Sequence, residues 1–305
     1  MNFINKKFQF LIIPALIIIA GIVMFAVRGG FNYDIEFMGG VRMQVNMGAQ
    51  FDNDELAKVI EDKTQVKVTV QDSGDGTVAL IKTPPIEDTV KDEMFNAIKE
   101  KYSLEDAALM SASSASASFG AEVQRKAFVY TLIAIICILL YIAFRFEVRS
   151  AVMAVVALVV NVLVMMSVYA IAYIPLNTTF IAAMLTVVGY SINNTIVIFD
   201  RIRENMKRVV AKKTYSVSDT VNNSISESMG RTINSTITTL ITIVLLYFLG
   251  VNAIKDFALP LIVGIIAGAY SSILIAGPFW GAWKEAEREA KAKAALEARS
   301  KKKNK

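Results

Sequence analysis

Six long apolar runs, separated by polar segments, set the pattern of this chain. A transmembrane helix needs about 20 consecutive apolar residues, and each run is near that length. The fifth run is short and rich in threonine, so we expect its helix to begin earlier, near Arg231. The pattern predicts an α-helical polytopic membrane protein with six transmembrane helices, at 8–27, 127–144, 150–171, 178–199, 236–251 and 257–279.

The segment between the first two runs has a different pattern. Residues 28–125 hold ten Lys or Arg and seventeen Asp or Glu, and no apolar run of membrane length. Strand-like alternation and helical spacing follow one another in the order βαββαβ, which predicts a small α+β ferredoxin-like domain. The small polar stretch 111–118 is typical of a flexible linker. The predicted elements are strand 41–45, helix 51–62 with Asp52 as its cap, strand 66–70, turn 73–76, strand 77–82, helix 86–101 and strand 107–110.

Four basic segments alternate along the chain with loops that are nearly uncharged. The positive-inside rule places the basic segments and both termini in the cytoplasm, and therefore makes the 28–125 domain extracytoplasmic. The basic tail is typical of an anchor that touches anionic lipid, and contact with a ribosome is the alternative. The predicted parts are 1–27 (N-terminus and first helix), 28–125, 126–279 (five helices with a cytoplasmic loop at 200–231) and the tail 280–305.

Composition narrows the chemistry that is open to the chain. It is 54% hydrophobic, 19% charged and carries a net charge of +5. There is no histidine and one cysteine, Cys137, so the usual ingredients of zinc sites and of Ser-His or Cys-His nucleophiles are missing. We expect no enzyme activity, no metal, no cofactor and no nucleic-acid partner.

Polar residues inside the apolar runs are costly and therefore informative. On the 178–199 helix, Thr186, Tyr190, Asn193 and Asn194 share one broad face, although adjacent asparagines point about 100° apart. Two interpretations stay open: hydrogen bonds that hold helices together, or a transport path. Where this helix meets the cytoplasm, ion pairing of Asp200 with Arg203 accounts for the charged set Asp200, Arg201, Arg203 and Glu204.

The last two helices also carry patterned residues. No Asp or Glu lies in the middle of any span, so the chain lacks the group that a self-contained proton carrier needs. Polar residues stack on the fifth helix, and a small-residue seam on the sixth favours close packing. The stack is Arg231, Asn234, Ser235, Thr238, Thr239 and Thr242, and the seam is Gly264, Gly268, Ser271 and Ser272.

Five segments together resemble the SecD/SecF family of protein-export membrane proteins, related to the RND transporters, and in particular its SecF members. The most specific is 189–205, GYSINNTIVIFDRIREN, which is similar to the family signature GYSINDTVVVFDRIREN. The segment 33–40, with Asp34, Gly39 and Gly40, is similar to the family's D-x-x-G-G-type motif after the first span. The remaining matches are 118–127, 231–239 and 264–272, and the resemblance covers about residues 8–280.

The resemblance implies a subunit that pairs with a SecD-like partner in the bacterial cytoplasmic membrane. With the SecYEG channel, and after the SecA step, the complex would use the proton gradient to complete preprotein translocation. The implied ion-path or relay residues are Tyr190, Asn193, Asn194, Arg231, Thr238 and Thr239.

Position 194 departs from the family pattern, which has Asp there. An asparagine amide does not titrate in the useful range. The sequence leaves three explanations open: the partner supplies the only membrane carboxylate, sodium is the coupling ion, or coupling is weak. Two rivals also remain: a stand-alone RND-type exporter of small molecules or lipids, and an assembly factor that transports nothing.

Overall fold

A computed structural model describes residues 2–73, 76–145, 147–210, 216–250 and 252–303. The chain divides into two compact units. The α+β unit comprises Asn32–Tyr130 with Pro175–Thr178, and the helical unit comprises Met1–Phe31, Thr131–Ile174 and Thr179–Lys305. Part of the predicted turn at 73–76 and the last two residues of the tail lie outside the described residues.

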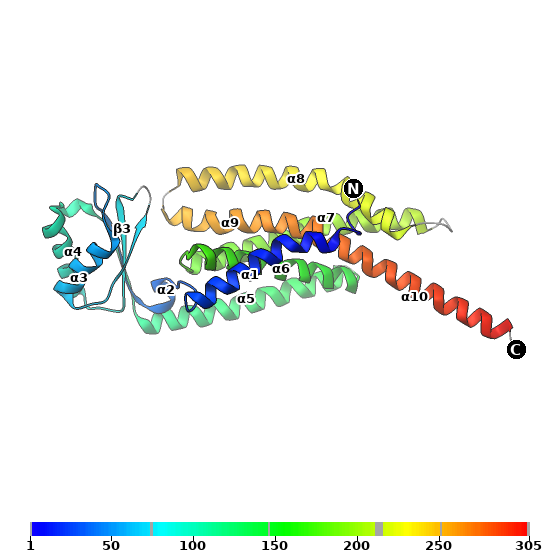
Figure 1. The fold of residues 1–305 in the computed structure, drawn as a ribbon, viewed down its shortest axis with the longest axis horizontal. Coiled ribbons are helices and arrows are strands. Elements are labelled where there is room, and N and C mark those ends of the chain that lie inside the picture. The colour runs from blue at the N-terminus through cyan, green and yellow to red at the C-terminus, as the bar shows by residue number, and fades with distance from the viewer. Residues whose placement is uncertain (1, 74–75, 146, 211–215, 251, 304–305) are drawn as a thin grey trace. The chain divides into compact units, whose positions relative to one another are not determined.

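The α+β unit contains the predicted βαββαβ arrangement. Its antiparallel sheet has the strand order β2-β3-β1-β4, with α3 and α4 together on one face (Figure 1). The fold class predicted from the pattern is therefore confirmed. The elements are α2 (Ile35–Met38), β1 (Gly40–Asn46), α3 (Asn53–Thr64), β2 (Thr69–Ser73), β3 (Val78–Thr83), α4 (Asp88–Tyr102), η1 (Asp106–Ala108) and β4 (Leu109–Ala115).

Local sequence explains this unit well. Alternate residues of β3 are buried, and together with Met43 and Val45 of β1 they meet apolar pairs four residues apart on the two helices. The Asp52 carboxylate caps α3, accepting hydrogen bonds from the backbone N–H groups of Asp54 and Glu55 at 2.8 and 2.9 Å. The core consists mainly of Met43, Val45, Leu56, Ile60, Ala79, Ile81, Met94 and Ile98.

The prediction of a linker at 111–118 is wrong for its first half. Residues 111–115 belong to strand β4, which pairs antiparallel with β1. The strand lies at the sheet edge and most of its residues are exposed, so it needs no apolar alternation. Its backbone hydrogen bonds, rather than side-chain burial, hold it in place.

Among the residues that the structure describes, six helical segments are long and apolar enough to cross a membrane, as predicted. Two boundaries differ from the prediction. The supposed loop 200–231 is largely helical, because α7 continues to Val210 and α8 begins at Val217. The last span continues through a π-helical turn into the tail. The elements are α1 (Lys7–Val27), α5 (Ala117–Arg145), α6 (Val148–Ala172), α7 (Thr178–Val210), α8 (Val217–Leu249), α9 (Asn252–Ser271), η2 (Ser272–Ala276) and α10 (Gly277–Lys303).

Pro14 lies inside α1 without leaving an unsatisfied carbonyl. Proline has no N–H, so the carbonyl of Phe10, four residues earlier, loses its helical donor. The Tyr270 hydroxyl from α9 donates to that Phe10 oxygen at 2.8 Å. A tertiary hydrogen bond thus replaces the missing helical one and ties α1 to α9.

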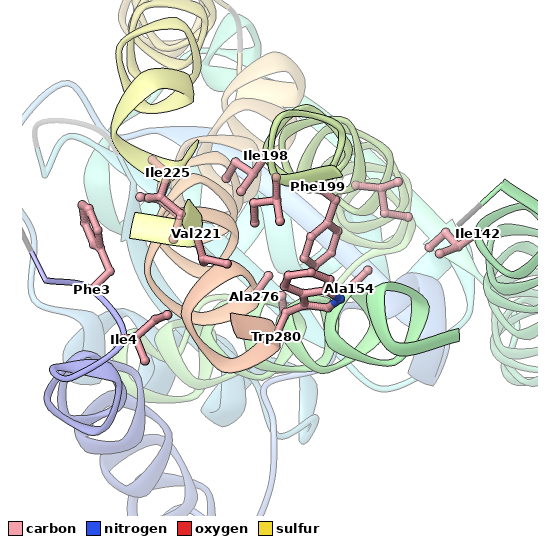
Figure 2. Close-up of a cluster of buried hydrophobic side chains, with 14 of the residues drawn as sticks. Phe3, Ile4, Ile142, Ala154, Ile198, Phe199, Val221, Ile225, Ala276 and Trp280 are labelled. Carbon is pink, nitrogen blue, oxygen red and sulfur yellow. The ribbon is translucent and has the colours of Figure 1, made fainter. Parts of the chain in front are cut away.

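A buried apolar cluster holds the ends of α7, α8 and α10 together with the start of the chain (Figure 2). Phe199 of α7 lies beside Trp280 of α10, with ring centroids 6.3 Å apart. The backbone N–H groups of Phe3 and Ile4 both donate to the Asn222 side chain, at 2.9 and 3.2 Å. This packing fixes the end of α7, the helix that carries the specific signature.

Candidate functional site

The two adjacent asparagines of α7 have opposite environments. Asn194 is 3% exposed and faces the interior of the helical unit, whereas Asn193 is on the exposed surface. The 100° step between neighbouring residues produces this division. The predicted common face for Tyr190, Asn193 and Asn194 therefore separates into an inward part and an outward part.

The inward part of α7 meets the small-residue seam of the last span. The Thr195 and Ser272 hydroxyls lie 2.8 Å apart, and both are within hydrogen-bond distance of the Ser191 carbonyl oxygen. Ser271 instead bonds within its own helix, to the Gly268 carbonyl. The polar groups of α7 and η2 thus join directly, at a π turn of a kind that often marks functional positions.

The two glycines of the seam allow three helices to approach closely. A Cβ on Gly264 would lie 2.6 Å from Val187 of α7 and 2.7 Å from the sulfur of Met165 on α6. A Cβ on Gly268 would lie 3.0 Å from the Asn161 amide nitrogen and 3.1 Å from the Ser191 hydroxyl. Asn161 was missed by the sequence reasoning, and its only signal was a lone amide in the third apolar run.

The outward part of α7 continues onto α8. Thr186 and Asn193 of α7 are exposed, and of the predicted polar stack on α8 only Thr239 is half-buried while its other members are exposed, namely Arg231, Asn234, Ser235, Thr238 and Thr242. Between the helices, the Tyr190 hydroxyl donates to Thr236, a residue that the sequence reasoning missed, at 3.5 Å. Several threonine hydroxyls on this face are satisfied by carbonyls of their own helix, namely those of Thr186, Thr238, Thr239 and Thr242.

A charged cluster joins α7 to α8 near their connection. Arg201 binds Glu204 on its own helix at 2.7 Å and Glu227 on α8 at 2.5 Å. Asn205 donates to Glu227 at 2.8 Å. Ion pairing in this segment therefore centres on Arg201, and the described contacts do not contain the expected Asp200–Arg203 pair.

Asp200 and Arg231 line a polar pocket that includes this charged cluster. Arg203 is exposed on another side of α7. The pocket lies where the signature segment of α7 passes the start of the polar stack on α8. Of the predicted charged set, Asp200, Arg201 and Glu204 thus share one site with Arg231.

The Asp34-Gly39-Gly40 motif joins two strands in the α+β unit. Asp34 is 1% exposed, accepts a hydrogen bond from Arg42 at 2.8 Å and lies 3.3 Å from the Lys82 ammonium. Gly40 has φ +130°, and a Cβ there would lie 2.0 Å from the Thr83 carbonyl oxygen. The carboxylate joins two neighbouring strands, β1 and β3, and the glycine lets them meet.

The same segment also forms hydrogen bonds with the residues that precede and begin α7. The backbone N–H of Asp34 donates to the Leu176 carbonyl at 2.9 Å, and the Leu176 N–H donates to Asn32 at 2.7 Å. Glu36 accepts two hydrogen bonds from Thr178, at 2.8 Å from its N–H and 2.6 Å from its hydroxyl. A carboxylate at the first residue of a helix both satisfies its N–H and complements its dipole.

The comparisons with known proteins identify the family. The family model "Protein export membrane protein SecD/SecF, C-terminal" matches residues 94–286. The chain belongs to the SecD/SecF family. It is 34% identical to the protein translocase subunit SecF of Alicyclobacillus acidocaldarius, over 93% of this chain and 92% of that protein.

Longer members of the family resemble this chain over part of their length. It is 32% identical to the protein translocase subunit SecDF of Bacillus subtilis, over 94% of this chain but only 38% of that protein. The crystal structure of Thermus thermophilus SecDF, described as a translocon-associated membrane protein, matches with a TM-score of 0.82 at 31% identity. That match covers 93% of this chain and 38% of the SecDF chain.

The family and the six spans together define a multi-pass membrane protein. The SecF and SecDF relatives are protein translocase subunits, which favours the translocase interpretation over a stand-alone exporter. Among the described residues there is no group of three or more His, Cys, Asp or Glu that could hold a metal.

Proposed function

We propose that this chain is a translocase subunit that works with a SecD-like partner to complete preprotein translocation across the bacterial cytoplasmic membrane. The observation that carries the proposal is the pair of matches of different length. Separate SecF proteins match this chain nearly end to end, whereas it covers 38% of fused SecDF. A SecD-like partner would play here the part that the rest of the fused chain plays there.

The outward polar face supports a partner within the membrane. Asn193 and the α8 residues Asn234 and Thr238 are exposed at the surface of helices long enough to span a bilayer. Amides and hydroxyls that face lipid are costly, so such a face needs a protein neighbour or water. The SecD-like partner is the neighbour that we assign to it.

The ion path would run along α7, with its titrating carboxylate on the partner. Position 194 cannot exchange a proton in this chain, and no Asp or Glu lies in mid-span. Tyr190, Asn193, Thr238 and Thr239 would face or flank that path, and Arg231 would lie near its cytoplasmic end. We assign no catalytic chemistry to the chain, and we include SecYEG, SecA-dependent preproteins and membrane lipids among its partners.

Loss of the chain should slow export. In cells depleted of it, unprocessed secreted precursors should accumulate, and the intact chain should restore their processing. The partner gene should stay intact during the depletion. Additional expression of the partner alone serves as the control. Normal precursor processing after depletion would contradict the proposed function.

Topology can be tested by labelling. We propose cytoplasmic termini, with 28–125 outside. In a chain with Cys137 replaced, a cysteine at exposed Lys58 should react in intact cells, or in spheroplasts where an outer membrane is present, with a membrane-impermeant maleimide. A cysteine at exposed Arg203 should react only after lysis. The reverse pattern would overturn the assignment of sides.

A further inference from the structure

We propose that the interior of the helical unit contains a bound-water site between α6, α7 and α9, formed by Asn161, Ser191 and Asn194. The ligand is water, held by uncharged amide and hydroxyl groups. The inference does not depend on the proposed function, because it rests on contacts within this chain. It gives position 194 an environment of its own, separate from the outward face that we assign to a partner.

The observation that carries the site is a group of buried polar atoms that lack a hydrogen-bond partner in the structure. Asn161 and Ser191 are 0% exposed, and Asn194 is 3% exposed. The unpaired atoms are both Nδ2 and Oδ1 of Asn161, Oγ of Ser191 and Nδ2 of Asn194. Buried polar groups in folded proteins are almost always paired with protein or with water, so four such atoms in neighbouring positions require an explanation.

Three of these atoms lie close together, and the fourth lies on the same side of α7. The Asn161 amide nitrogen and the Ser191 hydroxyl both lie about 3 Å from the position of a Cβ on Gly268, and therefore within about 6 Å of each other. Asn194 follows Ser191 by three residues on α7, so it lies on the same side of the helix. One water molecule can span such a gap with hydrogen bonds of about 2.8 Å on each side.

The surrounding hydroxyls are already engaged elsewhere. Thr195 and Ser272 bind each other and the Ser191 carbonyl oxygen. Ser271 binds the Gly268 carbonyl. Nearby side chains thus leave the Asn161 and Asn194 amides to another partner, and the missing side chain of Gly268 lets the Asn161 and Ser191 groups approach α9 closely.

The mixture of unpaired donors and acceptors distinguishes water from a cation. A sodium ion would bind the Asn161 and Ser191 oxygens but would leave the N–H groups of Asn161 and Asn194 unsatisfied. Water both donates and accepts, so it can satisfy all of them. The group also lacks a carboxylate to compensate for a buried positive charge.

Thermal unfolding of the purified full-length chain in mild detergent tests the site. Leucine has as many side-chain heavy atoms as asparagine but no polar group. Asn161→Leu should lower the Tm by about 2–6 °C, because it removes the water and strands the remaining polar atoms. The Tm of the double variant Asn161→Leu/Asn194→Leu should fall by less than the sum of the decreases in the two single variants, because both substitutions remove the same water.

Two further variants separate hydration from packing. Asn161→Ser keeps a polar group and leaves space for a second water, so its Tm should stay closer to wild type than that of Asn161→Leu. Asn234→Leu, on the exposed face of α8, is the matched control and should change the Tm little. A fall with Asn161→Ser as large as that with Asn161→Leu would indicate packing alone and overturn the proposal.

Other results would also overturn it. An unchanged or raised Tm for Asn161→Leu would mean a dry site, where removing an unpaired amide is favourable. A wild-type Tm raised by NaCl relative to KCl, with the increase lost in Asn161→Leu, would mean a sodium site. A density map that shows ordered waters should contain a peak within about 2.7–3.2 Å of Asn161 and Ser191, and its absence would contradict the assignment.

Discussion

The α+β unit and the helical unit bury polar side chains in different ways. In the α+β unit the buried group is a carboxylate, Asp34, held by the cations of Arg42 and Lys82. In the helical unit the buried groups are the amides and hydroxyls of Asn161, Ser191 and Asn194. A small sheet can place two cations around one anion, whereas any charge at the centre of a membrane-spanning bundle is energetically costly.

The comparison shows where charge is useful in this molecule. In the α+β unit it joins two strands, and in the helical unit it is kept near the helix ends, where Arg201 links α7 to α8. The mid-membrane part of α7 keeps polarity without charge. A partner carboxylate facing α7 would therefore meet hydrogen-bonding groups and not a competing anion.

The largest loss of stability is expected at Gly40, where the backbone of the Asp34 motif packs against β3. Gly40→Ala would place a Cβ against the Thr83 carbonyl at a φ of +130°, so we expect the α+β unit to lose more than about 4 kcal/mol of stability. Limited proteolysis should show rapid cleavage within 40–115. Gly48→Ala is the control, since Gly48 has φ +68° with open space around it, and it should cost about 1 kcal/mol.

A smaller loss is expected when the buried charge itself is removed. Asp34→Asn leaves Arg42 and Lys82 beside a neutral amide, which should destabilise the α+β unit by about 3 kcal/mol. Denaturant unfolding followed by circular dichroism measures the change. Asp88→Asn, at an exposed ion pair, should have no measurable effect. Equal stability of Asp34→Asn and wild type would show that the ion pairs of Asp34 do not stabilise the α+β unit.

Placing a carboxylate in the helical unit tests the other half of the comparison. Asn194→Asp should lower stability by about 1–2 kcal/mol at neutral pH and leave assembly intact, because water and the Asn161 amide can solvate the anion. Acidification should remove part of that loss by neutralising the introduced group. Loss of the folded chain on this change would instead indicate a dry, tightly packed position.

The smallest effect is expected at the charged cluster that joins α7 to α8. Arg201→Gln removes ion pairs to Glu204 and Glu227, but all three side chains are partly exposed. Screening by solvent makes such pairs weak, so the Tm should change little and less still at high salt. A large, salt-independent fall in Tm would show that the cluster is more than a surface contact.

Sequence pattern predicted those parts of the fold that depend on local periodicity. The six spans followed from apolar runs of about 20 residues, and the βαββαβ order followed from spacings of 3.6 and 2 residues. The start of α8 was missed because 217–230 is polar and becomes helical by packing against α10 and the N-terminal residues. The last strand was predicted too early, at 107–110 in place of 109–115, because an edge strand with exposed side chains needs no alternation.

The candidate site was less predictable. The pattern showed that α7 is polar, but the direction of each polar residue depends on its neighbouring helices. Asn193 and Asn194 are adjacent in sequence and equal in chemistry, yet one is exposed and the other buried. Asn161 had no repeating partner in its own helix, so only the approach of α6 and α9 at Gly268 revealed its importance.

The central claim, that this chain pairs with a SecD-like partner, is tested most directly by purification from its native membrane. A tagged chain extracted in mild detergent should bring down a SecD-like protein in near-equal amount, identified by mass spectrometry. Asn193→Leu, on the outward face, should reduce that recovery while leaving the Tm of the chain unchanged. Recovery of this chain only as a monomer or homodimer would contradict the account.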